Sequence, residues 1–135
     1  LRGDPEAAKL PKEDFLLKSQ IAFVQSDLFE KISGTYDVIV SNPPYIKTEE
    51  IETLMPEVRE HDPILALDGG KDGLDFYRKV IAQAKEHLTA GGGLYFEIGF
   101  DQAGEVSACM SENGFREIEV VKDYAGLDRV VKGRV

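Results

Sequence analysis

Hydrophobic and polar residues follow one another along the chain in a pattern typical of an α/β protein. Runs rich in β-branched and aromatic residues predict strands at about 21–26, 37–41, 93–98, 115–121 and 129–135. An apolar stripe with three- and four-residue spacing predicts a long helix over 74–88. A second helix is expected over 102–112, with Asp101 as its cap and Asn113-Gly114 at its end.

The order of these elements is strand, strand, helix, strand, helix, strand, strand, which predicts a mixed sheet. A strand–helix–strand run with short loops implies parallel strands joined by right-handed crossovers. The strand ending at Ser41 is therefore expected beside the strand over 93–98, and the last two strands are expected to form an antiparallel hairpin. Residues 1–20 are interpreted as a poorly defined N-terminal arm, and residues 21–135 as one domain.

Local signals predict three further features of the chain. Thr48 has the character of a helix cap and acidic residues follow it, so a short helix is expected to begin there. Residues 55–73 are interpreted as mostly loop, because Pro56 and Pro63 interrupt them. The glycines at 91–93 are interpreted as the end of the long helix and a turn.

The stretch around which the chain is organised runs from residue 36 to residue 45. Its β-branched run over 38–40 predicts a strand buried on both faces. Pro43 and Pro44 have no N–H for a ladder and restrict the backbone of the residues before them. The chain is therefore expected to leave the carboxyl end of this strand as a stiff loop, with Asn42 at its start and Tyr45 at its end.

This four-residue loop suits a planar ligand that carries an NH₂ group. The side-chain oxygen of Asn42 and the carbonyl of Pro43 can accept hydrogen bonds from the two hydrogens, and the Tyr45 ring offers a flat stacking surface. The plain alternative is an ordinary proline turn, since Asn-Pro commonly opens turns. The complete sequence Asn-Pro-Pro-Tyr, directly after a predicted buried strand, favours the binding interpretation.

Several segments together resemble a known family. The run from Val40 to Ile46 is similar to the amino-methyltransferase signature of class I S-adenosylmethionine-dependent methyltransferases. The later segments resemble the HemK/PrmC family of release-factor-specific protein-(glutamine-N5) methyltransferases: Glu60 to Asp75, Phe96 to Gly99 with Gln102, Lys122 to Tyr124, and Asp128 to Val130. The resemblance implies a Rossmann-like α/β fold, S-adenosyl-L-methionine as cofactor, and N5-methylation of the glutamine in the Gly-Gly-Gln motif of peptide-chain release factors.

The same resemblance implies roles for individual residues. Asn42 is the expected catalytic residue, and substrate binding is expected from Asn42, Pro43, Pro44 and Tyr45. Asp27 and Leu28, together with Asn42, are the expected cofactor contacts, although Asp27 is equally consistent with a simple cap of the turn that follows it. Glu97 is expected near the cavity without an assigned role, and His61 is interpreted as a surface residue rather than a base.

The cofactor-binding half of a class I methyltransferase is not found in the sequence. The family's first strand, its glycine-rich loop and its ribose-binding acid are expected before Val24, but residues 1–19 hold a single glycine and no strand pattern before it. We therefore expect the chain to be the C-terminal part of the domain, lacking the first βαβ unit, and to bind the cofactor poorly by itself. The strand over 37–41 would then leave an open sheet edge, for which we expect a homodimer, strand swapping, or repositioning of the strand over 21–26 beside it.

Composition limits the alternatives. The formal net charge is −9, with 16 basic and 25 acidic side chains, which is the wrong sign for neutralising phosphates. An adenine-N6 DNA or RNA methyltransferase is therefore the weaker alternative, and nucleic acid is an unexpected partner. A third alternative is a fragment that binds a partner without cofactor.

The remaining composition indicates a cytoplasmic protein. Cys109 is the single cysteine, which excludes an internal disulfide and fits a reducing compartment. The sequence has neither an apolar run long enough for a membrane span nor a signal-peptide pattern. We expect no metal ion in the site.

Overall fold

The computed structural model describes residues 20–51, 53 and 64–135, which belong to two compact units, one up to Gly34 and one from Thr35 to Val135. Within the first unit, the described residues form a turn in which the Glu30 N–H donates to the Asp27 carbonyl at 3.1 Å. The predicted strand over 21–26 is wrong, because these residues carry no strand assignment. A strand needs a neighbouring ladder, and the described sheet contains no partner for this segment.

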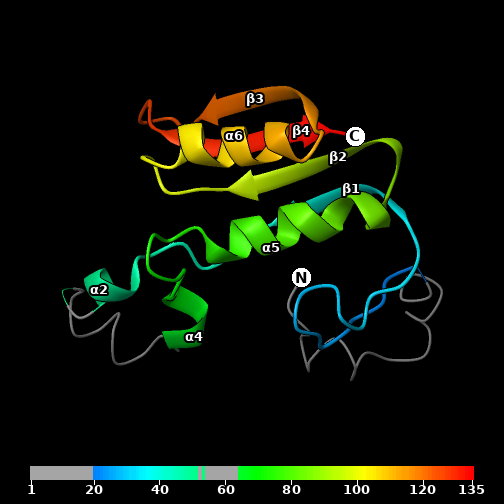
Figure 1. The fold of residues 1–135 in the computed structure, drawn as a ribbon, viewed down its shortest axis with the longest axis horizontal. Helices are drawn as coiled ribbons and strands as arrows, with labels where there is room; N and C mark the ends of the chain where they lie inside the picture. Colours follow the sequence, from blue (N-terminus) through cyan, green and yellow to red (C-terminus); the bar gives the residue numbers. More distant parts are fainter. Residues whose placement is uncertain (1–19, 52, 54–63) are drawn as a thin grey trace. The chain divides into compact units, whose positions relative to one another are not determined.

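The second unit is built on a mixed four-stranded sheet (Figure 1). Its strands are β1 (Tyr36–Ser41), β2 (Leu88–Glu97), β3 (Arg116–Lys122) and β4 (Asp128–Arg134). They lie in the order β1-β2-β4-β3, with β1 parallel to β2 and the other two pairs antiparallel. The predicted mixed sheet is confirmed, including the parallel neighbours β1 and β2 and the terminal hairpin.

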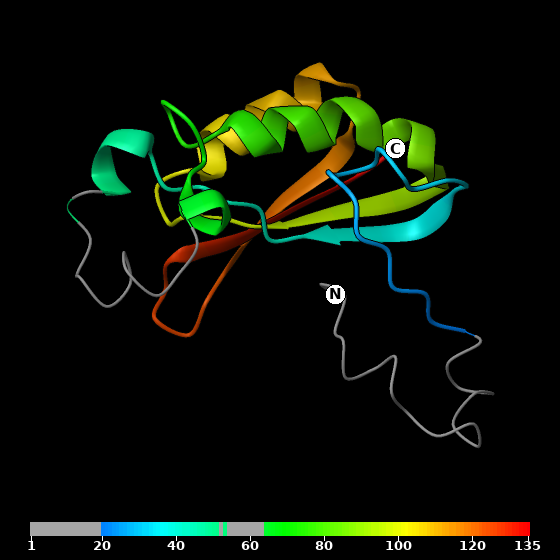
Figure 2. The same cartoon turned by 90° about the horizontal axis from the view of Figure 1, so that it is seen from below.

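Two longer helices, α5 (Asp75–Ala84) and α6 (Ala103–Glu112), lie on the same side of the sheet (Figure 2). Three shorter helices are α2 (Thr48–Ile51), α4 (Ile64–Leu67) and the 3-10 helix η3 (Lys85–His87). The α4 helix lies in a segment that the sequence predicted as mostly loop. None of the described helices is long and apolar enough to cross a membrane.

The core lies between these two helices and the sheet. The predicted apolar stripe of α5 is confirmed, because Tyr77, Val80, Ile81 and Ala84 are at most 3% exposed. The Tyr77 ring meets Phe96 of β2 edge to face, with ring centroids 5.1 Å apart. From the other elements, the core receives fully buried side chains of Leu94, Phe96, Met110 and Val131.

The prediction that β1 is buried on both faces is wrong in this chain. Val38 is 54% exposed and Val40 is 75% exposed, whereas Ile39 between them is half-buried. Successive side chains of a strand point to opposite faces, and the two longer helices cover only one face of the sheet (Figure 2). β1 is also the end strand of the described sheet, so its outer edge has no ladder partner there.

The glycines at 91–93 lie inside β2, so their interpretation as a helix end is wrong. The helical segment ends at His87, and β2 begins at the next residue. The register of β1 and β2 shifts between the pairs Tyr36–Leu88 and Val38–Gly93, and the extra residues form a bulge. Gly91 adopts a φ of +77° in this bulge, a conformation that side chains disfavour.

The ends of α6 are partly as predicted. Gln102 rather than Asp101 occupies the N-cap position, and no side chain caps the first turn. The predicted end at Asn113-Gly114 is confirmed, because Gly114 takes a φ of +85° and the Phe115 N–H returns to the carbonyl of Met110 at 3.0 Å.

A matched pair of glycine substitutions tests the bulge in β2. A Cβ at Gly91 or at Gly104 would meet no atom within 4 Å, and only Gly91 has a positive φ. We expect Gly91→Ala to destabilise the fold by about 1–2 kcal/mol through backbone strain. Gly104→Ala, in α6, should instead stabilise it by roughly 0.5–1 kcal/mol. Urea unfolding followed by circular dichroism measures both, and equal effects of the two variants would contradict the bulge.

Candidate functional site

The four residues from Asn42 to Tyr45, here called the NPPY loop, leave the sheet at the carboxyl end of β1. β1 ends at Ser41, which pairs with Phe96 of the parallel strand β2, so both strands end at the same edge. Ligands of open α/β sheets bind outside the carboxyl ends of the strands. In the loop, Asn42 is exposed, Pro43 is buried and Tyr45 is half-buried.

The two predicted acceptors of the NPPY loop are available. Within the described part of the chain, neither the side chain of Asn42 nor the carbonyl of Pro43 takes part in a hydrogen bond. The exposed Asn42 amide can therefore receive a donor from a ligand, and the Pro43 carbonyl keeps an unused acceptor in a buried residue. Their roles in substrate binding stay predictions.

Residues 69–73, the glycine loop, pack directly against the NPPY loop. A Cβ at Gly69 would lie 2.7 Å from the Tyr45 Cα, and a Cβ at Gly73 would lie 2.5 Å from the Tyr45 carbonyl oxygen. Both contacts are too short for any side chain, so this approach requires glycine. The sequence predicted these residues only as loop and did not indicate that their glycines support the NPPY loop.

Backbone and side-chain hydrogen bonds hold the glycine loop beside the start of α2. The Gly69 N–H donates to the Ile46 carbonyl at 2.8 Å, and the Thr48 N–H donates to the Gly70 carbonyl at 2.9 Å. The carboxylate of Asp68 accepts from the Thr48 hydroxyl at 2.6 Å and from the Gly70 N–H at 2.9 Å. The hydrogen bond from Thr48 has the larger effect and the one from Gly70 the smaller, and together they hold the pKa of Asp68 below its ordinary value.

Gln102 connects the parts of the site from beneath. Its side chain is buried, with 7% exposed. The Nε2 atom donates to the carbonyls of Tyr45 at 3.1 Å and Gly73 at 3.3 Å. The Oε1 atom accepts from the Gly99 N–H at 2.9 Å and from the Tyr77 hydroxyl at 3.4 Å. One side chain therefore joins the NPPY loop, the glycine loop, the end of β2 and α5.

Tyr77 extends this network to the last residue of β2. Its hydroxyl also lies 2.9 Å from the carbonyl of Glu97. Burial, and then the nearby Tyr45 and Glu97, raise the pKa of Tyr77 far above its usual value, so the phenol stays neutral and remains a donor. The Glu97 side chain is exposed, and the described contacts assign it no role.

A cavity of about 480 Å³ opens beside the NPPY loop. Tyr45, Gly99 and Gln102 form its inner wall, and charged side chains from the neighbouring loops and helices line the rest: Lys47, Glu50, Asp72, Asp101, Glu105 and Arg129. Arg129 is already engaged, because it donates to the Ile98 carbonyl at 3.1 Å and contacts the Asp123 carboxylate at 3.3 Å. The remaining charged groups make the mouth predominantly acidic.

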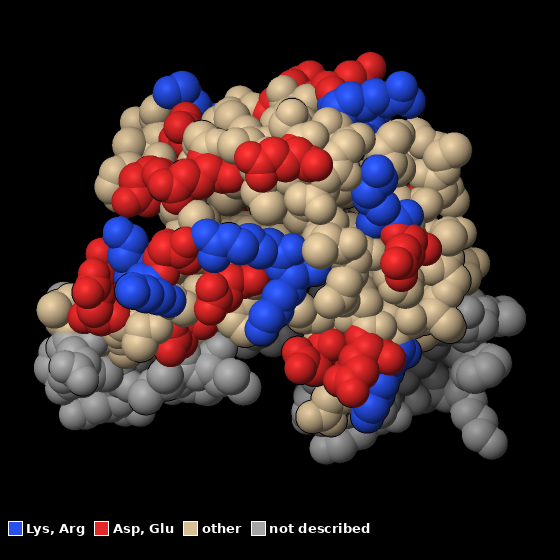
Figure 3. All heavy atoms as spheres, viewed as in Figure 1, with Lys and Arg blue, Asp and Glu red and all other residues tan. Residues whose placement is uncertain are grey.

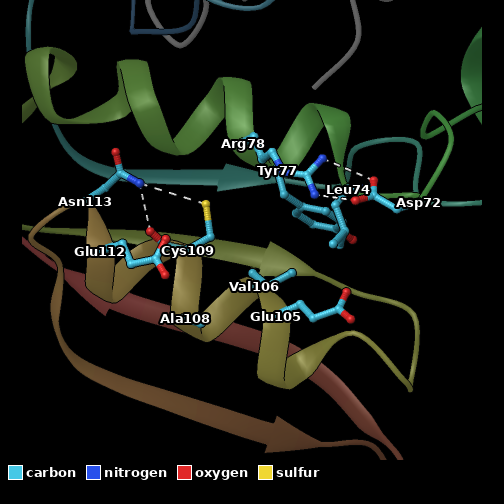
Figure 4. A pocket seen from close by; sticks show the side chains of 10 residues that line it. All are labelled: Asp72, Leu74, Tyr77, Arg78, Glu105, Val106, Ala108, Cys109, Glu112 and Asn113. Atoms are coloured by element: carbon cyan, nitrogen blue, oxygen red, sulfur yellow. Dashed lines mark hydrogen bonds and ion pairs between the residues drawn. The ribbon is translucent and has the colours of Figure 1, made fainter.

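A larger cavity of about 580 Å³ lies between α5 and α6 (Figure 4). Its polar groups pair with one another: Arg78 with the Asp72 carboxylate, and the Asn113 amide with the carbonyl of Cys109 at 2.8 Å. Burial raises the pKa of the Cys109 thiol, which keeps it in the unreactive thiol form. The smaller cavity is therefore the better candidate site, because Tyr45 of the NPPY loop lines it.

Charge and metal ligands narrow the chemistry further. On the face drawn in Figure 3, Lys and Arg are interspersed with Asp and Glu and form no continuous basic stripe. Among the described residues, no group of three or more His, Cys, Asp and Glu side chains is arranged to hold a metal ion. The NPPY loop itself offers an amide and a carbonyl beside this charged cavity, and such groups recognise a donor such as an NH₂ group.

For three residues singled out from the sequence, the structure gives no position relative to this site. Asp27 and Leu28 belong to the first unit, where Leu28 has a φ of +53° and Asp27 accepts a backbone hydrogen bond within its turn. Their place beside Asn42 at a cofactor stays a prediction. His61 lies outside the described residues.

Comparison with known proteins identifies methyltransferases. The family model described as Eco57I restriction-modification methylase matches residues 4–98. The release factor glutamine methyltransferase of Agrobacterium fabrum is 52% identical over 118 residues, covering 87% of this chain and 41% of that protein. The protein of the same name from Clostridium acetobutylicum is 43% identical over 127 residues, covering 92% of this chain and 45% of that protein. The chain thus spans less than half the length of these two relatives.

Solved structures show the same fold. The E. cuniculi Mtq2-Trm112 complex, described as responsible for methylation of the eRF1 translation termination factor, superposes with a TM-score of 0.55 at 25% identity, covering 87% of this chain and 65% of that chain. A methyltransferase from Pyrococcus furiosus superposes with a TM-score of 0.54 at 22% identity, covering 76% of this chain and 42% of that chain. The predicted class I methyltransferase fold is confirmed.

The pKa of Asp68 tests the attachment of the glycine loop. Because its folded pKa is lowered, its bonds to Thr48 and Gly70 stabilise the loop above the ordinary carboxyl pKa, and this contribution is lost as pH falls through the lowered value. Thr48→Val should raise the pKa of Asp68 in a carbon-13 NMR titration. Thr53→Val is the matched control, since the Thr53 hydroxyl bonds only the Glu50 carbonyl of its own turn. A pKa of Asp68 that is unchanged by Thr48→Val would contradict this arrangement.

Proposed function

Because the chain belongs to the Eco57I restriction-modification methylase family, we propose that it forms the substrate-binding part of an S-adenosylmethionine-dependent protein-glutamine N5-methyltransferase. The proposed substrate is the glutamine of the Gly-Gly-Gln motif in peptide-chain release factors. The resemblance to release factor glutamine methyltransferases that the sequence predicted is confirmed by identities of 43–52% to curated relatives of that name.

The observation that supports this function most directly is the pair of available acceptors after β1. A glutamine amide placed against the Tyr45 ring would donate one N–H to the Asn42 oxygen and the other to the Pro43 carbonyl. These acceptors stabilise the positive charge that develops on the nitrogen as it bonds to a methyl carbon. They also hold the nitrogen in line with that carbon, and alignment is a large part of the rate enhancement.

When bound, S-adenosylmethionine would supply a methyl group from its sulfonium to the amide nitrogen, which would give up a proton to solvent. The exposed, unbonded Asn42 amide at the end of β1 fits a polar contact to such a group. Asp27 and Leu28 are the further residues that we propose to hold it. No described side chain close to the NPPY loop has to change its charge for these contacts.

A second candidate is adenine-N6 methylation, since the exocyclic amine of adenine presents the same two hydrogens. The description of the matching family as a restriction-modification methylase favours it. The net charge of −9 and the mixed charges in Figure 3 oppose it, because a flipped base needs a basic groove for the flanking phosphates.

Substitution of Asn42 tests the proposed site in the whole protein. Asn42→Ala removes one acceptor for the transferred amide, so we expect a loss of about 10²–10³ in kcat on a release factor. Tyr45→Ala should raise the KM for release factor more than the KM for cofactor, and His61→Ala should change neither. Filter-binding assays with tritiated cofactor measure these constants.

Duplex and single-stranded DNA serve as competing substrates in the same assay. Methylation of DNA but not of release factor would replace the proposed function by the second candidate. Equal losses from His61→Ala and Asn42→Ala would contradict the assignment of the NPPY loop.

The chain of 135 residues, used by itself, should neither bind S-adenosylmethionine at micromolar concentration nor methylate a Gly-Gly-Gln peptide. A class I site holds its cofactor through a glycine-rich turn and an acid on the ribose, and neither was found in its sequence. The loss of several polar contacts of about 1 kcal/mol each weakens binding by orders of magnitude. Isothermal titration calorimetry tests this, and a saturable micromolar isotherm would overturn it.

A further inference from the structure

We propose that Gln102 is a positioning residue for methyl transfer, which holds the NPPY loop in the orientation that presents its two acceptors. Gln102 lies beneath the loop rather than at the reacting atoms, so it acts through the carbonyl of Tyr45. This role rests on the proposed function, and it assigns to α6 a part in a site whose acceptors follow β1.

The neighbours of Gln102 permit only one orientation of its side-chain amide. The Gly99 N–H can only donate, so the side-chain oxygen must face it, with the Tyr77 hydroxyl farther away at 3.4 Å. The carbonyls of Tyr45 and Gly73 are acceptors, so the NH₂ group must face those. A rotated amide would oppose like groups on both sides, and in a buried position each lost bond costs free energy. The arrangement therefore requires both ends of an amide.

Gln102 and Gly99 restrain both the carbonyl and the ring of Tyr45. Its carbonyl accepts from Gln102, and its ring lies against Gly99, where an added Cβ would be 3.2 Å from the Tyr45 Cδ2 atom. Gly99 is itself held by the Gln102 oxygen at 2.9 Å. Loss of the amide would therefore release the carbonyl of Tyr45 and the segment that supports its ring.

Because the NPPY loop is stiff, holding Tyr45 in place also fixes the positions of the acceptors on Asn42 and Pro43. Pro43 and Pro44 have fixed φ angles, and each proline restricts the residue before it, so few torsions are free between Tyr45 and Asn42. At the other end, Asn42 follows directly on Ser41, which is paired with β2. A segment that is stiff and anchored at both ends is preorganised, and misplacement of catalytic groups by about 1 Å can cost 10²-fold in rate.

The decisive variant is Gln102→Glu in the whole protein. It keeps the size of the side chain and the acceptor for Gly99 and Tyr77, but it turns an oxygen instead of a donor toward the carbonyls of Tyr45 and Gly73. We expect kcat on a release factor to fall roughly 10- to 100-fold, while the KM for cofactor changes little. Gln83→Glu is the matched control, since Gln83 is exposed on α5, and it should leave both constants unchanged.

A dependence on pH separates positioning from mere packing. Burial raises the pKa of a carboxyl group, so the introduced Glu should take up a proton as pH falls from about 8 to about 6, and its O–H can then donate to the Tyr45 carbonyl. The kcat of Gln102→Glu relative to the unmutated protein should therefore rise as pH falls. All rates are measured well below the unfolding temperature of each variant, with the folded fraction determined by circular dichroism at each pH.

Tyr77→Phe provides a further check, because it removes the hydroxyl that lies 3.4 Å from the Gln102 oxygen, together with its hydrogen bond to the Glu97 carbonyl at 2.9 Å. Its effect on kcat should be smaller than that of Gln102→Glu, and the double variant should lose less than the product of the two single losses. Independent, multiplicative losses would contradict a shared network.

The outcomes are distinct. A fully folded Gln102→Glu protein with unchanged kcat, or a loss that follows only the folded fraction, would overturn the positioning role and leave the proposed function intact. An unmutated protein that methylates no release factor would overturn the proposed function, and this role with it. A loss in kcat that reverses at lower pH, with an unaffected Gln83→Glu, supports both.

Discussion

The hydrogen bond from the Gln102 amide to the Tyr45 carbonyl is the interaction on which the site depends. Parallel pairing of β1 and β2 brings two chain segments out of the sheet at one edge, and their backbone polar groups would be buried there without partners. Gln102 satisfies them with a single side chain, since it donates to two loops and accepts from the Gly99 N–H. The close approach of Gly69 and Gly73 to Tyr45 leaves no room for a side chain at either glycine.

The groups of the NPPY loop and of the network beneath it are neutral. Asn42, Pro43, Gln102 and the un-ionised Tyr77 supply amides, a carbonyl and a phenol, whereas charged side chains, among them Asp72 paired with Arg78, line the neighbouring cavity. Transfer of a methyl group to an amide needs alignment and stabilisation of a developing charge more than a base. This agrees with a function in which preorganised acceptors do most of the catalysis, and it gives the rigidity of the NPPY loop a chemical purpose.

β1 carries the opposite character on its other side. Val38 and Val40 are exposed on the face that the two longer helices leave uncovered, and the outer edge of β1 has no partner in the described sheet. Exposed apolar strand edges pair readily with further strands. The homodimer expected from the sequence stays a prediction, and the chain spans only 41–46% of the length of three of its curated relatives.

Features that depend on neighbouring residues could be predicted from the amino-acid sequence, because periodicity, proline and turn chemistry act locally. These features are the stripe of α5, the terminal hairpin, the glycine end of α6 and the stiff NPPY loop. The packing of one element against another depends on contacts between residues that are far apart in the chain. Val40 is apolar, as buried residues usually are, but it lies on an uncovered face of the sheet. Gly91 is of the residue type that commonly ends helices, but it lies in a bulge of β2. In the sequence, Gln102 is one polar residue at the start of a predicted helix. Its importance appears only in the folded chain, where Tyr45, Gly73, Tyr77 and Gly99 meet its amide. Burial and hydrogen-bond partners are properties of the folded chain.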